Sequence, residues 1–263
     1  MFHTSNTFVP FNYALREADA VFMGIPFAST STSKPAIYGP VMVREALKLT
    51  EDFIGGKRIF EKVKMCDVGD LEVVPGSYEL TAQRIRETID DVRKENGKAF
   101  PIFIGGEHLI TLPIVESLKP KTIIHLDAHA DLRREYLGND YMHQTWGYHA
   151  SRIAKIIQVG VVSWSEEEKK VAKEKGVVSL TAEEFLKKTP VMKGPIHLTI
   201  DVDVLEGVAT GLPEGRMTMD TMDKLLDKIK CDSMDICEIA DYTLPSATGF
   251  KAAHIIMRML AKL

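Results

Sequence analysis

Acidic and histidine side chains occur at alternate positions directly after one apolar run of the chain. In HLDAHADLR (125–133) they are Asp127, His129 and Asp131, and the apolar run lies at 122–124. On a helix, positions i and i+2 point roughly 200° apart, whereas in an extended chain positions i, i+2 and i+4 lie on one side. The spacing therefore fits a shared metal ion only if this segment is extended.

Two further segments place similar groups after apolar runs. HLTIDVDVL (197–205) predicts a strand that continues to residue 203, with Asp201 and Asp203 on its polar side. In GGEH (105–108) two glycines predict a sharp turn that presents His108 at a strand end. Neighbouring buried carboxylates repel each other and are costly to desolvate, so we expect a cation beside them.

Together the three motifs supply four aspartates and two histidines and no thiolate. This donor set suits Mn²⁺ better than structural zinc, and bridging carboxylates would let six side chains bind two ions. On its own, DAHAD fits a solvated strand end as well as it fits a metal site. On its own, DVD fits a loop or a nucleotide-sugar DxD motif as well as it fits a metal site. In combination, at three predicted strand ends, they favour a dinuclear centre, which is suited to hydrolysis.

The elements that must position these groups alternate along the chain. Apolar runs predict strands at 19–25, 63–68, 100–104, 121–127, 156–162, 176–179, 195–203 and 234–240. Apolar spacings of three and four predict helices at 40–48, 81–96, 110–118, 165–174, 181–188, 219–229 and 250–262. This alternation predicts a three-layer αβα sandwich with a mainly parallel eight-stranded sheet, built as a single domain over 1–263. Ligands bind such sheets at the carboxyl ends of the strands.

Composition excludes several classes of function. The net charge is −4, and Lys and Arg are dispersed among Asp and Glu, so we expect no nucleic-acid partner. No run of eighteen apolar residues occurs, and the first twenty residues lack the pattern of a secretory signal, so we expect a cytoplasmic protein without a membrane anchor. Cys66, Cys231 and Cys237 form no CxxC pair and are predicted to be buried free thiols. The EEEKK run at 166–170 is predicted to be the solvated start of a helix.

These motifs resemble those of the ureohydrolases, the arginase and agmatinase family. GGEH (105–108), DAHAD (127–131), TIDVDVLEGVATG (199–211) and DICEIAD (235–241) match its motifs in order. Further matches at GIPF, SKPAIYGP, CDVGDLEV and QVGVVSWSEEE extend the resemblance over almost the entire chain. The arginase-like fold implied by this resemblance is the one that the strand and helix pattern predicts.

The resemblance implies a role for each site residue. One Mn²⁺ would be bound by His108, Asp127, Asp131 and Asp201, and the other by Asp127, His129, Asp201 and Asp203. Asp127 and Asp201 would bridge the two ions, and the hydroxide between the ions would attack the guanidinium carbon of the substrate. Asp131 would also orient that hydroxide, His143 would shuttle protons, and Glu238 would receive the substrate guanidinium. His125 and His197 would support the ligands or pack in the core.

The resemblance favours agmatine as the substrate, hydrolysed to putrescine and urea as in polyamine biosynthesis. LRREYLGNDYM (132–142) is typical of the agmatinase branch, but Arg133 and Arg134 could pair with a carboxylate and keep arginine or guanidinobutyrate as alternatives. Departures from the family pattern also leave the substrate open: Glu206-Gly207 replaces Asp-Pro in a shortened loop at 204–211, and positions 109, 144 and 162 hold unusual residues.

Two other classes remain open, namely a non-catalytic family member and a single-zinc amide hydrolase like the related deacetylases. The complete ligand set disfavours a non-catalytic family member. Carboxylates for a second metal ion disfavour a single-zinc amide hydrolase. By resemblance the protein would form a homo-oligomer, a trimer or hexamer.

Overall fold

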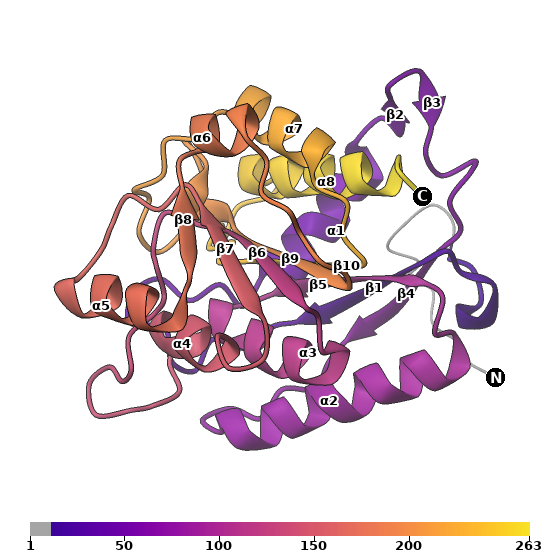
Figure 1. The fold of residues 1–263 in the computed structure, drawn as a ribbon. Coiled ribbons are helices and arrows are strands. Elements are labelled where there is room, and N and C mark those ends of the chain that lie inside the picture. The colour runs from indigo at the N-terminus through magenta and orange to yellow at the C-terminus, as the bar shows by residue number, and fades with distance from the viewer. Residues whose placement is uncertain (1–11) are drawn as a thin grey trace.

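The computed structural model describes residues 12–263. Eight strands form one sheet in the order β4-β1-β5-β10-β9-β6-β7-β8, and neighbouring strands run parallel (Figure 1). Their bounds are β1 Ala20–Ile25, β4 Met65–Asp70, β5 Phe100–Gly105, β6 Thr122–Leu126, β7 Lys155–Val159, β8 Val178–Leu180, β9 Ile196–Asp201 and β10 Ser233–Cys237. The eight predicted strands are therefore confirmed, with small shifts at their ends.

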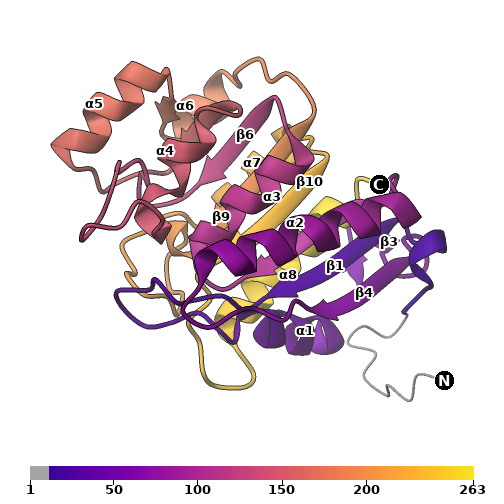
Figure 2. The same ribbon diagram turned by 90° about the horizontal axis from the view of Figure 1, so that it is seen from below.

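Helices cover both faces of this sheet (Figures 1 and 2). One layer packs α1 (Gly39–Leu49) against α8 (Ala247–Leu260), and α8 against α7 (Met219–Lys228), which contacts α6 (Ala182–Lys187). The other layer packs α2 (Tyr78–Glu95) against α3 (Thr111–Leu118), and α3 against α4 (Trp146–Ala150). Helix α5 (Glu166–Lys175) lies beyond the β8 edge in Figure 1. The predicted three-layer αβα sandwich is confirmed.

The sheet divides the apolar core in two because successive side chains of a strand point to opposite faces. Phe22 packs in the core under α1, α7 and α8, and its neighbour Met23 packs in the core under α2, α3 and α4. Strand residues such as Ile124 and Leu198 are fully buried, which explains why the strands read as continuous apolar runs.

Local sequence explains where the helices begin. Helix α2 starts after Ser77, whose side chain accepts a hydrogen bond from the backbone N–H of Leu80, and it buries Ile85 and Ile89 at a spacing of four. Helix α1 carries Pro40 in its first turn, where the missing N–H costs nothing.

Short elements escaped prediction. Helix α4 has five residues, and the hairpin of β2 (Phe53–Ile54) and β3 (Lys57–Arg58) has two residues in each strand, so neither shows a periodicity.

Between residues 12 and 263, none of the helices is long and apolar enough to cross a membrane. Cys66 and Cys237 are buried free thiols as predicted, while Cys231 is free and only partly buried. Residues 1–11, which belong to the stretch that lacks a secretory signal pattern, lie outside the described residues.

Candidate metal centre

Four neighbouring strands bring the predicted site residues to one edge of the sheet. Strands β5, β10, β9 and β6 are adjacent, although β6 follows β5 in sequence, so the chain crosses over at this point. The GGEH turn follows β5, Glu238 follows β10, Asp201 ends β9, and the DAHAD segment follows β6. The carboxyl ends of parallel strands at such a crossover form a binding crevice in open α/β sheets.

The DAHAD segment is extended only at His129, which forms an isolated parallel bridge with Ser163; the chain bends at Ala128, and this corrects the prediction from spacing. Strand β6 ends at Leu126, and Asp131 adopts a left-handed conformation with φ of 52°. The Oδ1 atom of Asp127 accepts a hydrogen bond from the backbone N–H of His129 at 2.6 Å, so the aspartate turns its own backbone. The three side chains therefore meet around the site through a turn and not through strand alternation.

Asp203 reaches the site by the same kind of turn, so the predicted strand to residue 203 is also too long. Strand β9 ends at Asp201, and Val202–Val204 form one turn of 3-10 helix. The Oδ1 atom of Asp201 accepts from the backbone N–H of Asp203 at 2.8 Å. A local aspartate-to-backbone hydrogen bond ends both strands, and periodicity alone does not reveal it.

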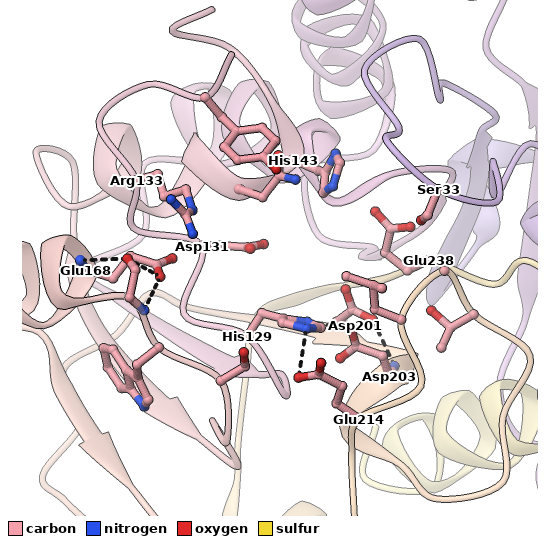
Figure 3. A pocket seen from close by; sticks show the side chains of 18 residues that line it. Ser33, His129, Asp131, Arg133, His143, Glu168, Asp201, Asp203, Glu214 and Glu238 are labelled. Carbon is pink, nitrogen blue, oxygen red and sulfur yellow. Dashed lines mark hydrogen bonds and ion pairs between the residues drawn. The ribbon is translucent and has the colours of Figure 1, made fainter. Parts of the chain in front are cut away.

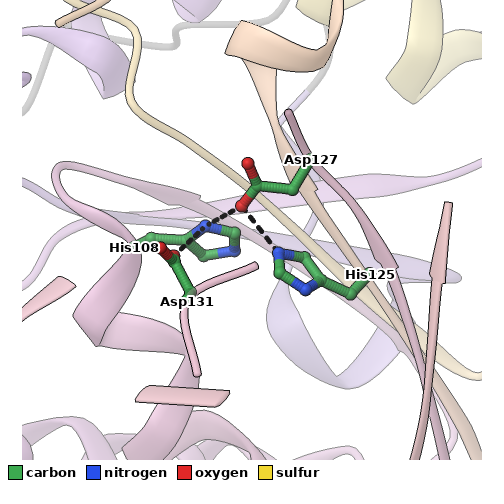
Figure 4. Close-up of side chains that lie close together, drawn as sticks. All are labelled: His108, His125, Asp127 and Asp131. Carbon is green, nitrogen blue, oxygen red and sulfur yellow. Dashed lines mark hydrogen bonds and ion pairs between the residues drawn. The ribbon is translucent and has the colours of Figure 1, made fainter. Parts of the chain in front are cut away.

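Four aspartates gather around two histidines at this edge; we call Asp127, Asp131, Asp201 and Asp203 the carboxylate cluster. The Nδ1 atom of His108 lies 3.2 Å from Asp127, 3.5 Å from Asp131 and 3.4 Å from Asp201 (Figure 4 shows the first two). On the other side, Nδ1 of His129 lies 2.8 Å from Asp203 and 3.6 Å from Asp127.

Asp127 stands between the two histidines. Its Oδ2 atom faces His108 and its Oδ1 atom faces His129. One carboxylate therefore offers a different oxygen to each side of the cluster, as a bridging ligand requires.

The cluster fits divalent cations. Nδ1 of His108 is buried without a hydrogen-bond partner, although it points at three carboxylates. Burial and the charges of neighbouring aspartates raise the pKa of Asp131 and Asp201 well above the usual range and that of Asp203 to about 7. Among the described residues, the ion-pair partners of these carboxylates are histidines, so a metal cation would supply the missing positive charge.

Buried polar groups behind the cluster fix the histidines. Thr199 donates to Asp235 at 2.6 Å and therefore accepts from Nε2 of His108 at 2.8 Å, which leaves Nδ1 as a lone-pair donor for a metal. Asp235 also pairs with His197 at 2.8 Å. The sequence analysis did not single out Thr199 and Asp235, although both lie in motifs that it quotes. Both are polar residues within buried strands.

His125 supports the cluster from the β6 side. Its Nε2 atom lies 2.6 Å from Oδ2 of Asp127, and its Nδ1 atom lies 3.0 Å from the side-chain amide of Gln158 (Figure 4 shows the first contact). The supporting position predicted for His125 and His197 is therefore what the geometry shows.

A pocket of about 260 Å³ opens over the cluster (Figure 3). Of the eight predicted site residues, His108 and Asp127 are fully buried beneath it, and the other six line it: His129, Asp131, His143, Asp201, Asp203 and Glu238. The structure therefore brings all eight together, and their individual roles stay predictions.

His143 and Glu238 both line this pocket, and Figure 3 shows them on the same side of it. Burial and the nearby His108 lower the pKa of His143 to about 4, and its Nδ1 atom has no hydrogen-bond partner. Glu238 has φ of 65°, and Oε1 of its side chain accepts from the backbone N–H of His108 at 2.9 Å. Burial and the charge of Asp201 raise its pKa well above the usual range. A cation bound beside Glu238 would relieve that repulsion.

The outer pocket contains groups that the sequence placed differently or did not indicate. Glu168, expected on a solvated helix start, is buried, lines the pocket and accepts from the side chain and backbone of Ser165 as a capping box. Arg133 lines the pocket, whereas Arg134 pairs with Glu174 at the surface. Glu214, which nothing in the sequence pattern singled out, lies 3.5 Å from Nε2 of His129.

Comparison with known proteins agrees with this geometry. The model of the arginase family matches residues 18–261. The chain is 32% identical to a Thermococcus kodakarensis protein named N(1)-aminopropylagmatine ureohydrolase, over 91% of this chain and 89% of that one. It is also 32% identical to an agmatinase of Pyrococcus horikoshii, over 94% and 92% of the two chains. The solved structure of an agmatine ureohydrolase of Thermoplasma volcanium superposes with a TM-score of 0.84 at 25% identity, covering 95% of this chain and 91% of that one.

Proposed function

The chain belongs to the arginase family, and on this premise we propose that it hydrolyses agmatine to putrescine and urea with two Mn²⁺ bound in each chain. The carboxylate cluster is the observation that carries the proposal. Four buried carboxylates surround two histidines, and among the described residues no lysine or arginine forms an ion pair with them.

The arrangement supports a division of the ligands between two ions. His108, Asp127, Asp131 and Asp201 would hold one, and Asp127, His129, Asp201 and Asp203 the other. When bound, a pair of Mn²⁺ ions supplies a water nucleophile at neutral pH and neutralises developing negative charge.

The pocket side chains complete the reaction. Glu238 pairs with the substrate guanidinium and fixes its carbon over the cluster, since a carboxylate accepts two of its N–H groups side by side. Asp131, held by a hydrogen bond from Nε1 of Trp146 at 2.9 Å, orients the attacking water. His143 is neutral at pH 7 and so accepts a proton and returns it to the leaving amine.

The relatives' names support a substrate of the agmatine type. One is named an agmatinase and another an N(1)-aminopropylagmatine ureohydrolase. Both of those substrates combine a guanidinium with an amine and lack a carboxylate, which suits a pocket rim that carries Glu214.

A second candidate is a guanidino acid such as arginine or guanidinobutyrate. Arg133 is the observation that favours it, because its guanidinium lines the pocket and could bind a carboxylate. The Arg133 side chain lies 5.2 Å from the ring of Tyr136, which holds it at the rim.

Urea release decides between these candidates. The protein is stripped with a chelator, reloaded with Mn²⁺ and assayed with agmatine, N(1)-aminopropylagmatine, arginine and guanidinobutyrate. We expect the highest kcat/KM for agmatine. Arg133→Met is expected to lower activity on the two acids only, if the protein uses them. No urea from any of the four would refute the proposal and favour a non-catalytic family member.

We also propose that the chain forms one domain over 1–263 and assembles as a homo-oligomer, a trimer or hexamer. One cooperative unfolding transition and a particle mass of three or six chains by light scattering would support these two proposals.

A further inference from the structure

Glu107 is a fully buried carboxylate beside the site, and the proposed reaction gives it no task. Its two oxygens accept three hydrogen bonds from one loop: from the backbone N–H of Thr30 at 2.9 Å, from Oγ1 of Thr30 at 2.6 Å and from Oγ of Ser31 at 3.1 Å. Its own backbone N–H donates to the carbonyl of Phe27 at 2.7 Å. Glu107 therefore binds the loop that follows β1 at two points.

The glycine before Glu107 brings these two backbones together. A Cβ atom at Gly106 would collide with the carbonyl oxygen of Phe27, so this close approach requires glycine. The backbone N–H of Gly106 also donates to the carbonyl of Ile25 at 2.8 Å. The GGEH turn thus sets the path of the loop after β1 in addition to presenting His108.

The same loop reaches the pocket. Ser33 lines the pocket and packs so closely against Gly211 that a Cβ there would collide with its hydroxyl (Figure 3 labels Ser33). The side-chain amide of Gln144 donates to Oγ1 of Thr32 at 3.4 Å. One face of residues 30–33 therefore contacts Glu107, and the other contacts the segment that carries His143.

We infer that Glu107 is a positioning residue, which anchors residues 30–33 so that Ser33 and His143 are held in place against the substrate. This inference rests on the proposed function. A carboxylate suits the task because it has only acceptor sites and can satisfy three converging donors at once. Two of the three donors are on Thr30, and the same loop accepts a hydrogen bond from Gln144, the residue after His143, so the anchor acts next to the proton-transferring group.

Three variants test the inference. Glu107→Ala removes all three acceptor contacts. Glu107→Gln preserves them, because its oxygen can accept from the Thr30 amide and Ser31 while its amide donates to Oγ1 of Thr30. Glu184→Ala is the matched control: Glu184 accepts from the backbone N–H and hydroxyl of Thr181, as Glu107 does from Thr30, but it lies at the start of α6 and outside the pocket.

The readouts are amide hydrogen exchange over residues 28–33, bound Mn²⁺ per chain, and kcat and KM for agmatine. In Glu107→Ala we expect faster exchange in the loop with unchanged metal content. We expect a loss in kcat/KM on the order of 10²-fold, because small misplacements of positioned groups cost that much. Glu107→Gln should recover at least a third of the wild-type kcat/KM, and Glu184→Ala should match the wild type.

Several results would overturn the inference. One is a wild-type rate of amide exchange in the loop of Glu107→Ala, and another is faster exchange there with kcat/KM within twofold of the wild type. A third is failure of Glu107→Gln to restore activity. Loss of bound metal in Glu107→Ala would also overturn it, because Glu107 would then support the metal centre. If Glu107→Ala does not fold, Thr30→Val with Ser31→Ala removes two of the three donors from the loop side. That double variant should show the same changes to a smaller degree, and wild-type behaviour would overturn the inference.

Failure of the proposed function is distinguishable from failure of the anchor. A wild-type protein that releases no urea would refute the function, and with it the effect on catalysis. The exchange measurement would still show whether Glu107 holds the loop.

Discussion

Two clusters of buried charge lie in this sheet, and they are balanced in different ways. At the end of β4, Asp67 accepts hydrogen bonds from the buried guanidinium of Arg44 at 2.8 and 2.9 Å, and Asp70 pairs with the same arginine. We call these three residues the arginine cluster. Burial alone would lower the pKa of Arg44, but the two aspartates outweigh it and raise the pKa. In the carboxylate cluster the partners are histidines, and more negative charge remains than the chain neutralises.

The comparison separates a structural ion pair from a cation site. CDVGD and DVD both place two aspartates near a strand end, so the sequence motifs look alike. The arginine cluster contains its own cation, because α1 brings Arg44 under β4. On the proposed function, the carboxylate cluster takes its cations from solution. Substitutions in the first should therefore change stability, and substitutions in the second should change metal binding and activity.

Asp201→Asn is expected to have the largest effect. Losing the charge of a bridging ligand should lower kcat/KM for urea release by about 10³-fold, since metal assistance contributes several kcal/mol and each factor of ten corresponds to about 1.4 kcal/mol. The metal-free variant should be at least as stable as the metal-free wild type, because burial and its neighbours already favour a neutral Asp201. Steady-state kinetics and urea unfolding in chelator test both statements. Retained activity, or a large loss of stability, would contradict the assignment.

Arg44→Met should show the opposite pattern. It leaves the buried carboxylate of Asp67 without its cation, so the free energy of unfolding should fall by about 3–5 kcal/mol. Activity per folded molecule should stay within twofold of the wild type, and added Mn²⁺ should not abolish the difference in stability. The control is Arg134→Met, which removes an exposed pair with Glu174 and should change stability little. An inactive but stable Arg44→Met protein would remove the distinction between the clusters.

The smallest effect concerns the pH dependence of the metal-free protein. Burial, with the charge of Asp127 next, raises the pKa of Asp203 to about 7, so between pH 4 and pH 7 the folded state binds more protons than the unfolded state. Stability contributed by such a group is present at low pH and is lost as the pH rises through the folded pKa. Burial raises the pKa of other carboxyls in the same direction: Glu107, Asp131, Asp201 and Glu238.

Four histidines also contribute. Despite burial, the neighbouring aspartates raise the pKa of His108 and raise that of His129 to about 12, so these two act with the carboxyls, whereas His125 and His143 oppose the trend. Burial lowers the pKa of His125 and of His143, so their contribution rises with pH over part of the range.

Asp127 and Asp235, whose pKa the neighbouring histidines lower despite burial, oppose the trend mainly near and below pH 4, where aspartates of an unfolded chain titrate. Because five carboxyls and two histidines act in one direction against His125 and His143, we expect the free energy of unfolding in chelator to fall between pH 4 and pH 7, on the order of 1 kcal/mol per pH unit. Saturating Mn²⁺ should reverse the slope, because metal binding requires deprotonated ligands. A metal-free protein that gains stability over this range would contradict this account.

The fold was largely predictable because its strands are buried on both faces. Apolar runs such as that at 122–124 therefore stand out, and helices such as α2 show clear spacing. The ends of β6 and β9 were not predictable from periodicity. There, Asp127 and Asp201 bond to the backbone two residues later and turn the chain, a local interaction that leaves the apolar pattern unchanged.

The site was predictable to the extent that its residues lie in short motifs with chemical spacing. Its supports were not, because Thr199, Gln158 and Glu107 act through partners distant in sequence. Glu107 bonds to residues 76 and 77 positions away, and Thr199 to His108 at a separation of 91. Only the topology of the sheet brings such pairs together.

Counting bound metal tests the central claim most directly. Metal-free protein is equilibrated with Mn²⁺ by dialysis, and the ions bound per chain are measured for the wild type, Arg44→Met and Asp201→Asn. We predict two Mn²⁺ per chain for the wild type and for Arg44→Met, and fewer for Asp201→Asn. A wild-type chain that binds one ion or none would contradict the account.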